Sequence, residues 1–120
     1  PLNARPFSLA SSPDEAHVKV GTHIGSGSRY KKRLMKLVPG DTIQMFGPYL
    51  NFIPPADSLP IVMLAQGIGI TPFRSLLLWL AAHEPARATH LIHVESEPHT
   101  YRTETETAAT SARYVTNPEM

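Results

Sequence analysis

The sequence predicts a chain of two unequal halves, α+β to α/β in class. In the first half apolar and polar residues alternate, which is typical of half-buried antiparallel strands. In the second half a continuous apolar run leads through a glycine-containing turn into an apolar helix, as in the first strand–helix–strand unit of a parallel sheet. A proline-rich segment separates the two patterns. We therefore expect one domain over 1–53, a linker over 54–60 and a second domain over 61–120.

The first half is expected to contain three short strands and one helix. Residues 7–10 are a short segment closed by turn residues, whereas 17–24 and 42–46 alternate with period two, and Gly-Pro closes the second of these. Ser28 is a good N-cap because its hydroxyl can accept a hydrogen bond from a free amide of the first turn. The helix that follows is predicted over 29–37, where Pro-Gly-Asp ends it.

The second half starts with 61–65, a run typical of a strand buried on both faces. Thr71 is a candidate N-cap, and Pro72 suits the first position of a helix. That helix is predicted to continue to about His83, where Glu-Pro ends it. A second parallel strand is expected over 89–94.

Beyond this strand, 95–112 is polar and rich in Thr and Ala, which predicts a loop and a weak helix. A third short strand is expected over 113–115. His90 and His93 are three positions apart on a predicted strand and so face opposite sides, which disfavours a shared metal ion. We expect no metal site, and we expect Trp79 to be a core residue.

Composition excludes several classes of protein. The 120 residues contain no cysteine, which excludes disulfides, zinc–thiolate sites and four-thiolate iron–sulfur clusters. A net charge of +1 gives no argument for nucleic acid. Polar residues interrupt the apolar stretch 59–80, so we expect no membrane span. The first residues lack the pattern of a signal peptide, and we expect a cytoplasmic location.

Five of the eleven basic residues lie within eight positions directly after Ser28. They are Arg29, Lys31, Lys32, Arg33 and Lys36. Cations at a helix N-terminus are unfavourable unless an anion lies there, and the free amides of that end attract anions. Two interpretations remain open, a site for a nucleotide phosphate and a solvated basic face.

A second candidate site is the loop Gly67-Ile68-Gly69-Ile70-Thr71-Pro72, between a buried strand and a helix. Glycines allow a tight turn and a close approach of the backbone to a pyrophosphate. A packing turn without a ligand is the alternative.

A third candidate is Arg5-Pro6-Phe7-Ser8, which offers a guanidinium for phosphate, an aromatic ring for stacking and a hydroxyl. By itself this combination would indicate nothing, since an aromatic residue in a strand is more often part of a core.

In chain order these segments resemble motifs of the ferredoxin–NADP⁺ reductase-like superfamily. They are Arg5-Pro6-Phe7-Ser8, Gly25-Ser26-Gly27-Ser28, Gly47-Pro48-Tyr49-Leu50-Asn51-Phe52, Gly67 to Pro72, and Tyr101-Arg102. Leu50 and Gln66 stand where the family pattern has smaller residues. The resemblance implies part of an antiparallel flavin-binding β-barrel, followed by the first βαβ unit of a parallel nucleotide-binding sheet.

The resemblance also implies roles for residues of the first motif. Arg5 would hold the flavin phosphate, with Pro6 beside it in the motif. Phe7 would lie against the isoalloxazine ring. Ser8 would form a hydrogen bond near the flavin N5 and count as catalytic.

In the second motif, Gly25, Gly27 and Ser28 would bind the pyrophosphate through the hydroxyl and adjacent amides, with Lys31 on phosphate. The nicotinamide loop would be formed by Gly67, Gly69, Thr71 and Pro72. Thr71 would face the contact between flavin and nicotinamide and is the second catalytic candidate.

From the resemblance we expect a central fragment of an FAD-dependent oxidoreductase that takes hydride from NAD(P)H. Its partner would be a redox acceptor, either an iron–sulfur or haem protein or domain, or a small molecule. Self-association through open strand edges is also expected. Two alternatives remain open, a non-catalytic nucleotide-binding or self-associating module and a basic anion-binding domain.

Overall fold

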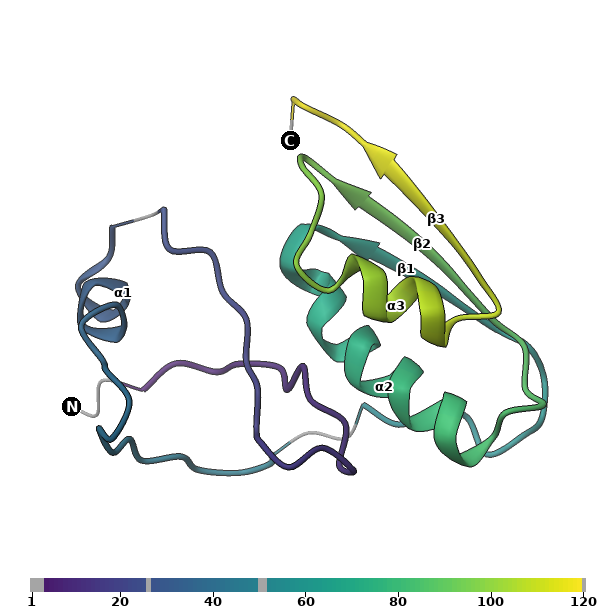
Figure 1. The fold of residues 1–120 in the computed structure, drawn as a ribbon, viewed down its shortest axis with the longest axis horizontal. Helices are drawn as coiled ribbons and strands as arrows, with labels where there is room; N and C mark the ends of the chain where they lie inside the picture. Colours follow the sequence, from purple (N-terminus) through teal and green to yellow (C-terminus); the bar gives the residue numbers. More distant parts are fainter. Residues whose placement is uncertain (1–3, 26, 50–51, 120) are drawn as a thin grey trace.

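A parallel three-stranded sheet with two helices on one face forms the second half of the chain (Figure 1). The computed structural model describes residues 4–25, 27–49 and 52–119. The strands are β1 (Ile61–Gln66), β2 (Thr89–Glu95) and β3 (Ser111–Thr116), in the order β1-β2-β3.

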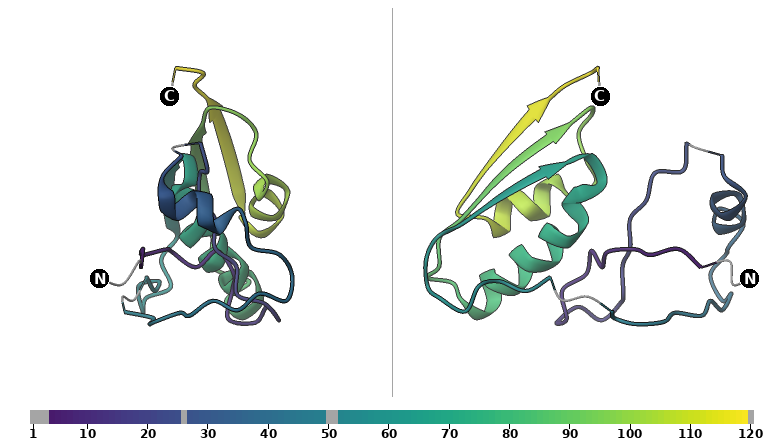
Figure 2. Two further views of the ribbon diagram at one scale, coloured as in Figure 1. Left: turned by 90° about the vertical axis from the view of Figure 1, so that its left-hand side faces the viewer. Right: turned by 180° about the vertical axis from the view of Figure 1, so that it is seen from behind.

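Helix α2 (Ile70–His83) connects β1 to β2, and α3 (Arg102–Ala108) connects β2 to β3. Ile61 is paired with Thr89 in the register. Because the strands follow one another in one direction across the sheet, right-handed crossovers bring both helices to the same face. The two helices also contact each other on this face, and both views of Figure 2 show them side by side.

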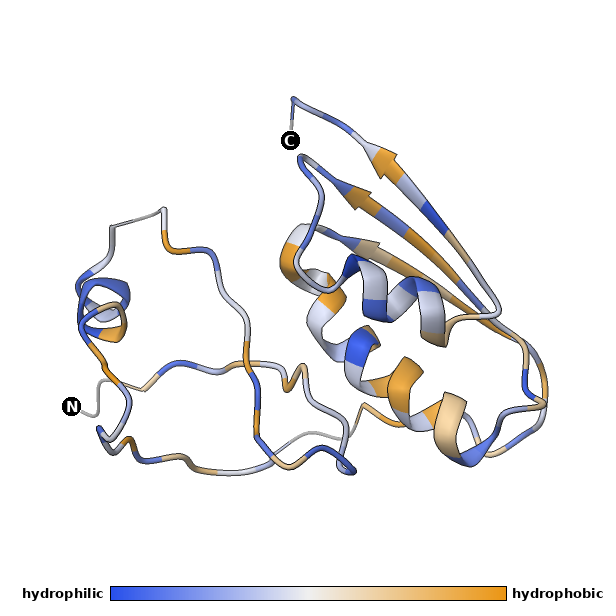
Figure 3. Ribbon diagram, in the orientation of Figure 1, coloured by the Kyte–Doolittle hydropathy of each residue, from blue (hydrophilic) through white to orange (hydrophobic). Residues whose placement is uncertain are grey.

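The core lies between this face and α2. Its fully buried members are Met63, Ala65, Ile70, Leu77, Leu80 and Leu91. On α2 the buried apolar residues recur at spacings of seven and three, one side of a helix. Figure 3 shows the hydrophobic colour along β1 and β2 and over the C-terminal half of α2, whereas β3 carries it mainly in its arrowhead. Trp79 packs against this core, as expected.

The opposite face of the sheet is apolar and open. Val62 and Leu64 of β1 are each 69% exposed, and Ile92 and Val115 are also exposed. The prediction that β1 is buried on both faces is therefore wrong for the described residues. The reason is topological, since both crossover helices lie on the face that holds Met63 and Ala65.

The first half of the chain is extended and carries one short helix, α1 (Arg29–Leu34). The strands expected over 7–10, 17–24 and 42–46 do not form ladders among the described residues. One antiparallel bridge, Leu9 to Val20, joins the first two segments, with the amide of Ala10 donating to the carbonyl of Lys19 at 2.8 Å. Strands require a paired neighbour, so a local sequence pattern alone leaves these segments irregular.

Several predicted boundaries need correction. Helix α1 ends at Leu34, three residues before the expected end. Helix α2 begins at Ile70 after a 3₁₀ turn over Gly67–Gly69, so Thr71 lies inside the helix and is not its N-cap. The end of α2 at His83 is confirmed, as are the second and third strands. The second strand is one residue longer than expected, and the third, at six residues, is twice as long as expected.

No helix within 4–25, 27–49 and 52–119 combines the length and the apolar character needed to cross a membrane.

Candidate functional site

A pocket of about 200 Å³ lies beside α1, in the first half of the chain. Its lining residues are Arg5, Pro6, Phe7, Thr22, Ser28, Tyr30 and Lys31. Five of these seven were predicted as site residues, from two motifs about twenty positions apart in sequence. The fold thus brings the first and second motifs together around one space.

Tyr30 is the aromatic centre of this pocket. Its ring centroid lies 6.0 Å from that of Phe7, with the planes tilted by 31°. The guanidinium carbon of Arg5 lies 5.6 Å from the same ring, within cation–π range. Among the described residues neither Arg5 nor Lys31 forms an ion pair, so the pocket has two cations available to an anion.

The second motif forms the entry to α1. The Ser28 hydroxyl accepts a hydrogen bond from the Lys31 amide at 3.2 Å, so the predicted N-cap is confirmed. Gly27 has a φ of 63°, a conformation that favours glycine. Gly25 is exposed with open space around its Cα, and Ser26 lies outside the described residues.

Ser8 is not part of the pocket lining and is exposed. Of the motif at 47–52, Leu50 and Asn51 lie outside the described residues. The lining of this pocket therefore gives no support to the roles predicted for Ser8 and for the turn at 47–52.

The glycine loop begins at Gly67, whose φ of 51° falls in the left-handed region. Its carbonyl accepts a hydrogen bond from His93 Nε2 on β2 at 2.9 Å. Gly69 is exposed, with open space where a side chain would extend, while Pro72 is half-buried. The loop thus lies at the carboxyl ends of β1 and β2, where parallel sheets bind ligands.

Thr71 is only 4% exposed, and its hydroxyl donates to the carbonyl of Ile68 at 3.2 Å. Its methyl group points toward the first half of the chain, because a Cβ placed on Gly21 would lie 3.0 Å from Thr71 Cγ2. The same Cβ would lie 3.8 Å from the Tyr101 ring. The absence of a side chain at Gly21 therefore allows the two halves to approach closely.

Gly21 and Thr22 join the two groups of predicted residues. Gly21 contacts the glycine loop, and the next residue, Thr22, lines the pocket beside α1. Neither was identified from the sequence, since nothing in the alternating pattern of 17–24 marks them. Tyr30 was also missed as a site residue, although its place between Ser28 and Lys31 was a usable signal.

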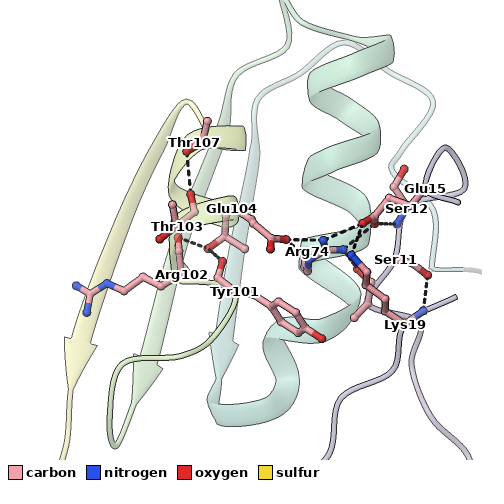
Figure 4. Close-up of polar contacts among 12 residues, drawn as sticks. Ser11, Ser12, Glu15, Lys19, Arg74, Tyr101, Arg102, Thr103, Glu104 and Thr107 are labelled. Atoms are coloured by element: carbon pink, nitrogen blue, oxygen red, sulfur yellow. Dashed lines mark hydrogen bonds and ion pairs between the residues drawn. The ribbon is translucent and has the colours of Figure 1, made fainter. Parts of the chain in front are cut away.

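One turn after Thr71 on α2, the buried Arg74 joins the two halves of the chain through ion pairs (Figure 4). Arg74 is 2% exposed and forms ion pairs with Glu15 of the first half and Glu104 of α3. The Tyr101 ring lies 4.9 Å from its guanidinium carbon. The bonds from Arg74 and Lys19 lower the pKa of the Glu15 carboxyl well below its ordinary value, although burial opposes this.

A second set of titratable groups lies at the carboxyl end of β2. Glu95 is 2% exposed, with its carboxylate oxygens 3.5 Å from His93 Nδ1 and from Arg102 Nη1. Neither oxygen accepts a hydrogen bond from the described residues. Burial lowers the pKa of nearby His99, and His93 acts in the same direction.

Three curated relatives share clear sequence similarity with the chain. A flavohemoprotein of Pseudomonas putida is 32% identical over 90 residues, which cover 74% of this chain and 22% of that protein. The Ferredoxin–NADP reductase B of Sorangium cellulosum is 35% identical over 72% of this chain and 36% of its own length. The sulfite reductase [NADPH] flavoprotein alpha-component of Bacillus subtilis is 36% identical over 63% of this chain and 15% of its own.

The chain belongs to the ferredoxin–NADP⁺ reductase-like superfamily. It spans between about a seventh and about a third of the length of these curated relatives. No family model matches the chain.

Solved structures show the same fold. A ferredoxin–NADP⁺ reductase from Plasmodium falciparum superposes with a TM-score of 0.76 over 93% of this chain and 50% of its own, at 19% identity. A cytochrome P450 reductase from Amycolatopsis gives a TM-score of 0.66 over 92% of this chain and 37% of its own, at 24% identity. Both superpositions extend over more than nine tenths of the chain.

Proposed function

We propose that this chain is the central part of a flavin-dependent oxidoreductase that passes hydride from NAD(P)H to FAD and electrons on to an acceptor. The first half, 1–53, would be part of the flavin-binding barrel, and 61–120 part of the nucleotide-binding domain. Relatives whose names include flavoprotein, flavohemoprotein and NADP reductase support this class of activity.

The observation that carries the proposal is the pocket beside α1. It combines two cations, a capping hydroxyl and two aromatic rings, which together suit an anionic cofactor with a planar ring system. Arg5 and Lys31 would neutralise a phosphate, and Ser28 with its neighbouring amides would bind the same group. Phe7 and Tyr30 would offer apolar surface to a ring.

FAD, when bound, would supply the ring that accepts hydride from the nicotinamide and releases electrons singly or in pairs. The chain's own contribution is to bind and orient. The Ser8 hydroxyl, exposed on the same segment as Arg5, would donate a hydrogen bond near the reacting end of the flavin.

On the nucleotide side, Gly67 and Gly69 would let the backbone approach a pyrophosphate closely. Thr71 would hold the glycine loop against the first half of the chain. Its hydroxyl is already bonded within the turn, and its methyl group contacts the first half at Gly21. The electron acceptor would be an iron–sulfur or haem protein or domain, or a small molecule.

The direct test is to add FAD to the purified chain, desalt it and record the visible spectrum, then add NADH or NADPH. We expect retained flavin that either nucleotide bleaches. Arg5→Ala should weaken flavin retention, while the matched change Arg113→Ala, on the open face of the sheet, should not. Ser8→Ala should keep the flavin but slow its bleaching.

Equal flavin retention by the Arg5 and Arg113 variants would remove Arg5 from the site. Retained flavin that neither nucleotide bleaches would instead support a non-catalytic nucleotide-binding module. Binding that falls steeply with salt and shows no preference for flavin over other polyanions would indicate a basic anion-binding domain.

A further inference from the structure

Arg74 is the most completely bonded side chain that connects the two halves. Its Nη1 donates to the Ala10 carbonyl at 2.6 Å and to Glu15 Oε2 at 2.7 Å, and its Nη2 donates to Glu15 Oε1 at 2.9 Å. Its Nε donates to Glu104 on α3. A planar guanidinium holds such a set of acceptors in one fixed geometry, which a flexible ammonium cannot do.

The position of Arg74 relates this cluster to the candidate catalytic residues. Arg74 lies one turn after Thr71 on α2, and its acceptor Ala10 lies two residues after Ser8. The bond between Arg74 and Ala10 is thus a short connection between the segment that holds Ser8 and the helix that holds Thr71.

The contacts around Arg74 also bear on the junction itself. Tyr101 lies on the Arg74 guanidinium and close to Gly21, where the glycine loop meets the first half. Glu15 is held in turn by the Ser12 amide at 2.7 Å and by Lys19 at 2.9 Å, which fixes it within its own segment. The cluster therefore has rigid attachments on both sides of the junction (Figure 4).

Resting on the proposed function, we propose that Arg74 is a positioning residue that sets the separation between the flavin-binding segment and the nicotinamide loop. It touches neither reacting group. It acts through Ala10 and Glu15 on one side and through Thr71 and Tyr101 on the other. Loss of this connection should leave each half folded but free to vary its distance from the other.

The absence of cysteine makes a direct distance measurement possible. Lys32→Cys on α1 and Glu106→Cys on α3 introduce two labelling sites at exposed positions, one in each half. Spin labels at these sites report the distance between the halves by pulsed electron resonance, with no cofactor present. We expect one narrow distance distribution in the labelled parent and a broad one after Arg74→Gln.

Two carboxylates of the same cluster provide a matched comparison. Glu15→Gln removes a partner of Arg74 across the junction, whereas Glu104→Gln removes a partner within the second half. We expect the distribution to broaden for Glu15→Gln and to stay narrow for Glu104→Gln. Arg74→Lys should recover part of the narrow distribution, because it keeps the charge but not the fork.

The rate of flavin bleaching in a flavin-loaded sample provides a second measurement. A purely structural role of Arg74 would leave this rate unchanged. Arg74→Gln should retain flavin like the parent, since the pocket beside α1 is intact, yet the rate of bleaching by NADH or NADPH should fall by about tenfold to a hundredfold. Far-UV circular dichroism checks that helices α2 and α3 are kept. If Arg74→Gln unfolds, the distance distributions of Arg74→Lys and Glu15→Gln test the positioning role instead.

A broad distribution in the parent would overturn the proposal, as would equally narrow distributions in the parent and both junction variants. Broadening by Glu104→Gln to the same extent as by Glu15→Gln would also overturn it, since the effect would then be a general loosening. If the parent retains no flavin but Arg74→Gln and Glu15→Gln broaden its narrow distribution, the proposed function fails while the positional role of Arg74 stands.

Discussion

The ion pair between Glu15 and Arg74 predicts a pH-dependent stability that one substitution should abolish. Glu15 accepts hydrogen bonds from two Arg74 nitrogens, from Lys19 and from the Ser12 amide, and its side chain is 23% exposed. In Glu15→Gln the carboxylate charge is lost, and the new amide group directs hydrogens at one of these donors. The buried Arg74 then keeps Glu104 as its one charged partner among the residues that the structure describes.

The magnitude follows from these contacts. Hydrogen bonds to a charged group contribute about 1.5–3 kcal/mol when one partner is removed. The partial exposure of Glu15 and the remaining Glu104 reduce the loss, so we expect Glu15→Gln to lower the free energy of unfolding by about 2 kcal/mol at pH 7. This corresponds to about a thirtyfold change in the unfolding equilibrium.

The sign of the pH dependence comes from the lowered pKa of Glu15. Its pKa in the folded state lies well below the ordinary 4.5, so its stabilisation is fully present above that value and is lost as pH falls below it. We expect the difference between the parent and Glu15→Gln to be constant from pH 7 to about pH 5.5, and to shrink on further acidification.

Urea unfolding at several pH values, followed by circular dichroism and by the fluorescence of the single tryptophan, measures this difference. The control is Glu97→Gln, an exposed carboxylate, with an expected change within about 0.5 kcal/mol. Equal stability of the parent and Glu15→Gln at pH 7, or a difference that does not change on acidification, would refute the reasoning.

Three further predictions concern packing and the segment 54–60. Leu77→Ala should lower the free energy of unfolding by about 2–5 kcal/mol in thermal or urea unfolding, because Leu77 is fully buried. Leu64→Ala, on the open face of the sheet, should lower it much less. Equal losses would contradict the assignment of the core. Gly21→Ala should destabilise by about 1–3 kcal/mol because its Cβ would lie 3.0 Å from the methyl group of Thr71, whereas Gly25→Ala, with open space around it, should be neutral. Arg87→Gln should increase protease cleavage within 54–60, because it removes hydrogen bonds to the carbonyls of Leu59 and Pro55 at 2.8 and 2.9 Å. Unchanged cleavage would show that these bonds do not hold this segment in place.

Local sequence was enough to predict the second half of the chain. The apolar run at 61–65, the glycines that follow and the Glu-Pro stop after His83 each act over a few residues, so the order strand, helix, strand could be read directly. The conformation of the turn between the strand and the helix could not be predicted in this way. Thr71 and Pro72 have the right chemistry for a helix start, yet the chain forms a 3₁₀ turn first and begins α2 at Ile70.

In the first half, local sequence did not predict the secondary structure. Alternation over 17–24 and 42–46 predicts strands, but a strand forms only when another segment pairs with it. Within the described part of the first half, the pairing consists of the one bridge between Leu9 and Val20. The motif residues were nevertheless useful. Arg5, Phe7, Ser28 and Lys31 were predicted as one binding site from motif order, and they do line one pocket.

By itself, the sequence determined the family, the order of the second-half elements and five of the seven residues that line the pocket beside α1, because these depend on short-range chemistry and on motif order. Only the tertiary structure decided which face of β1 is covered, that Gly21 meets Thr71, and that Arg74 joins Glu15 to Glu104. These pairs are between 30 and 59 residues apart in the chain. Their contacts arise from the packing of whole elements, and no local pattern records which distant residue will be the neighbour.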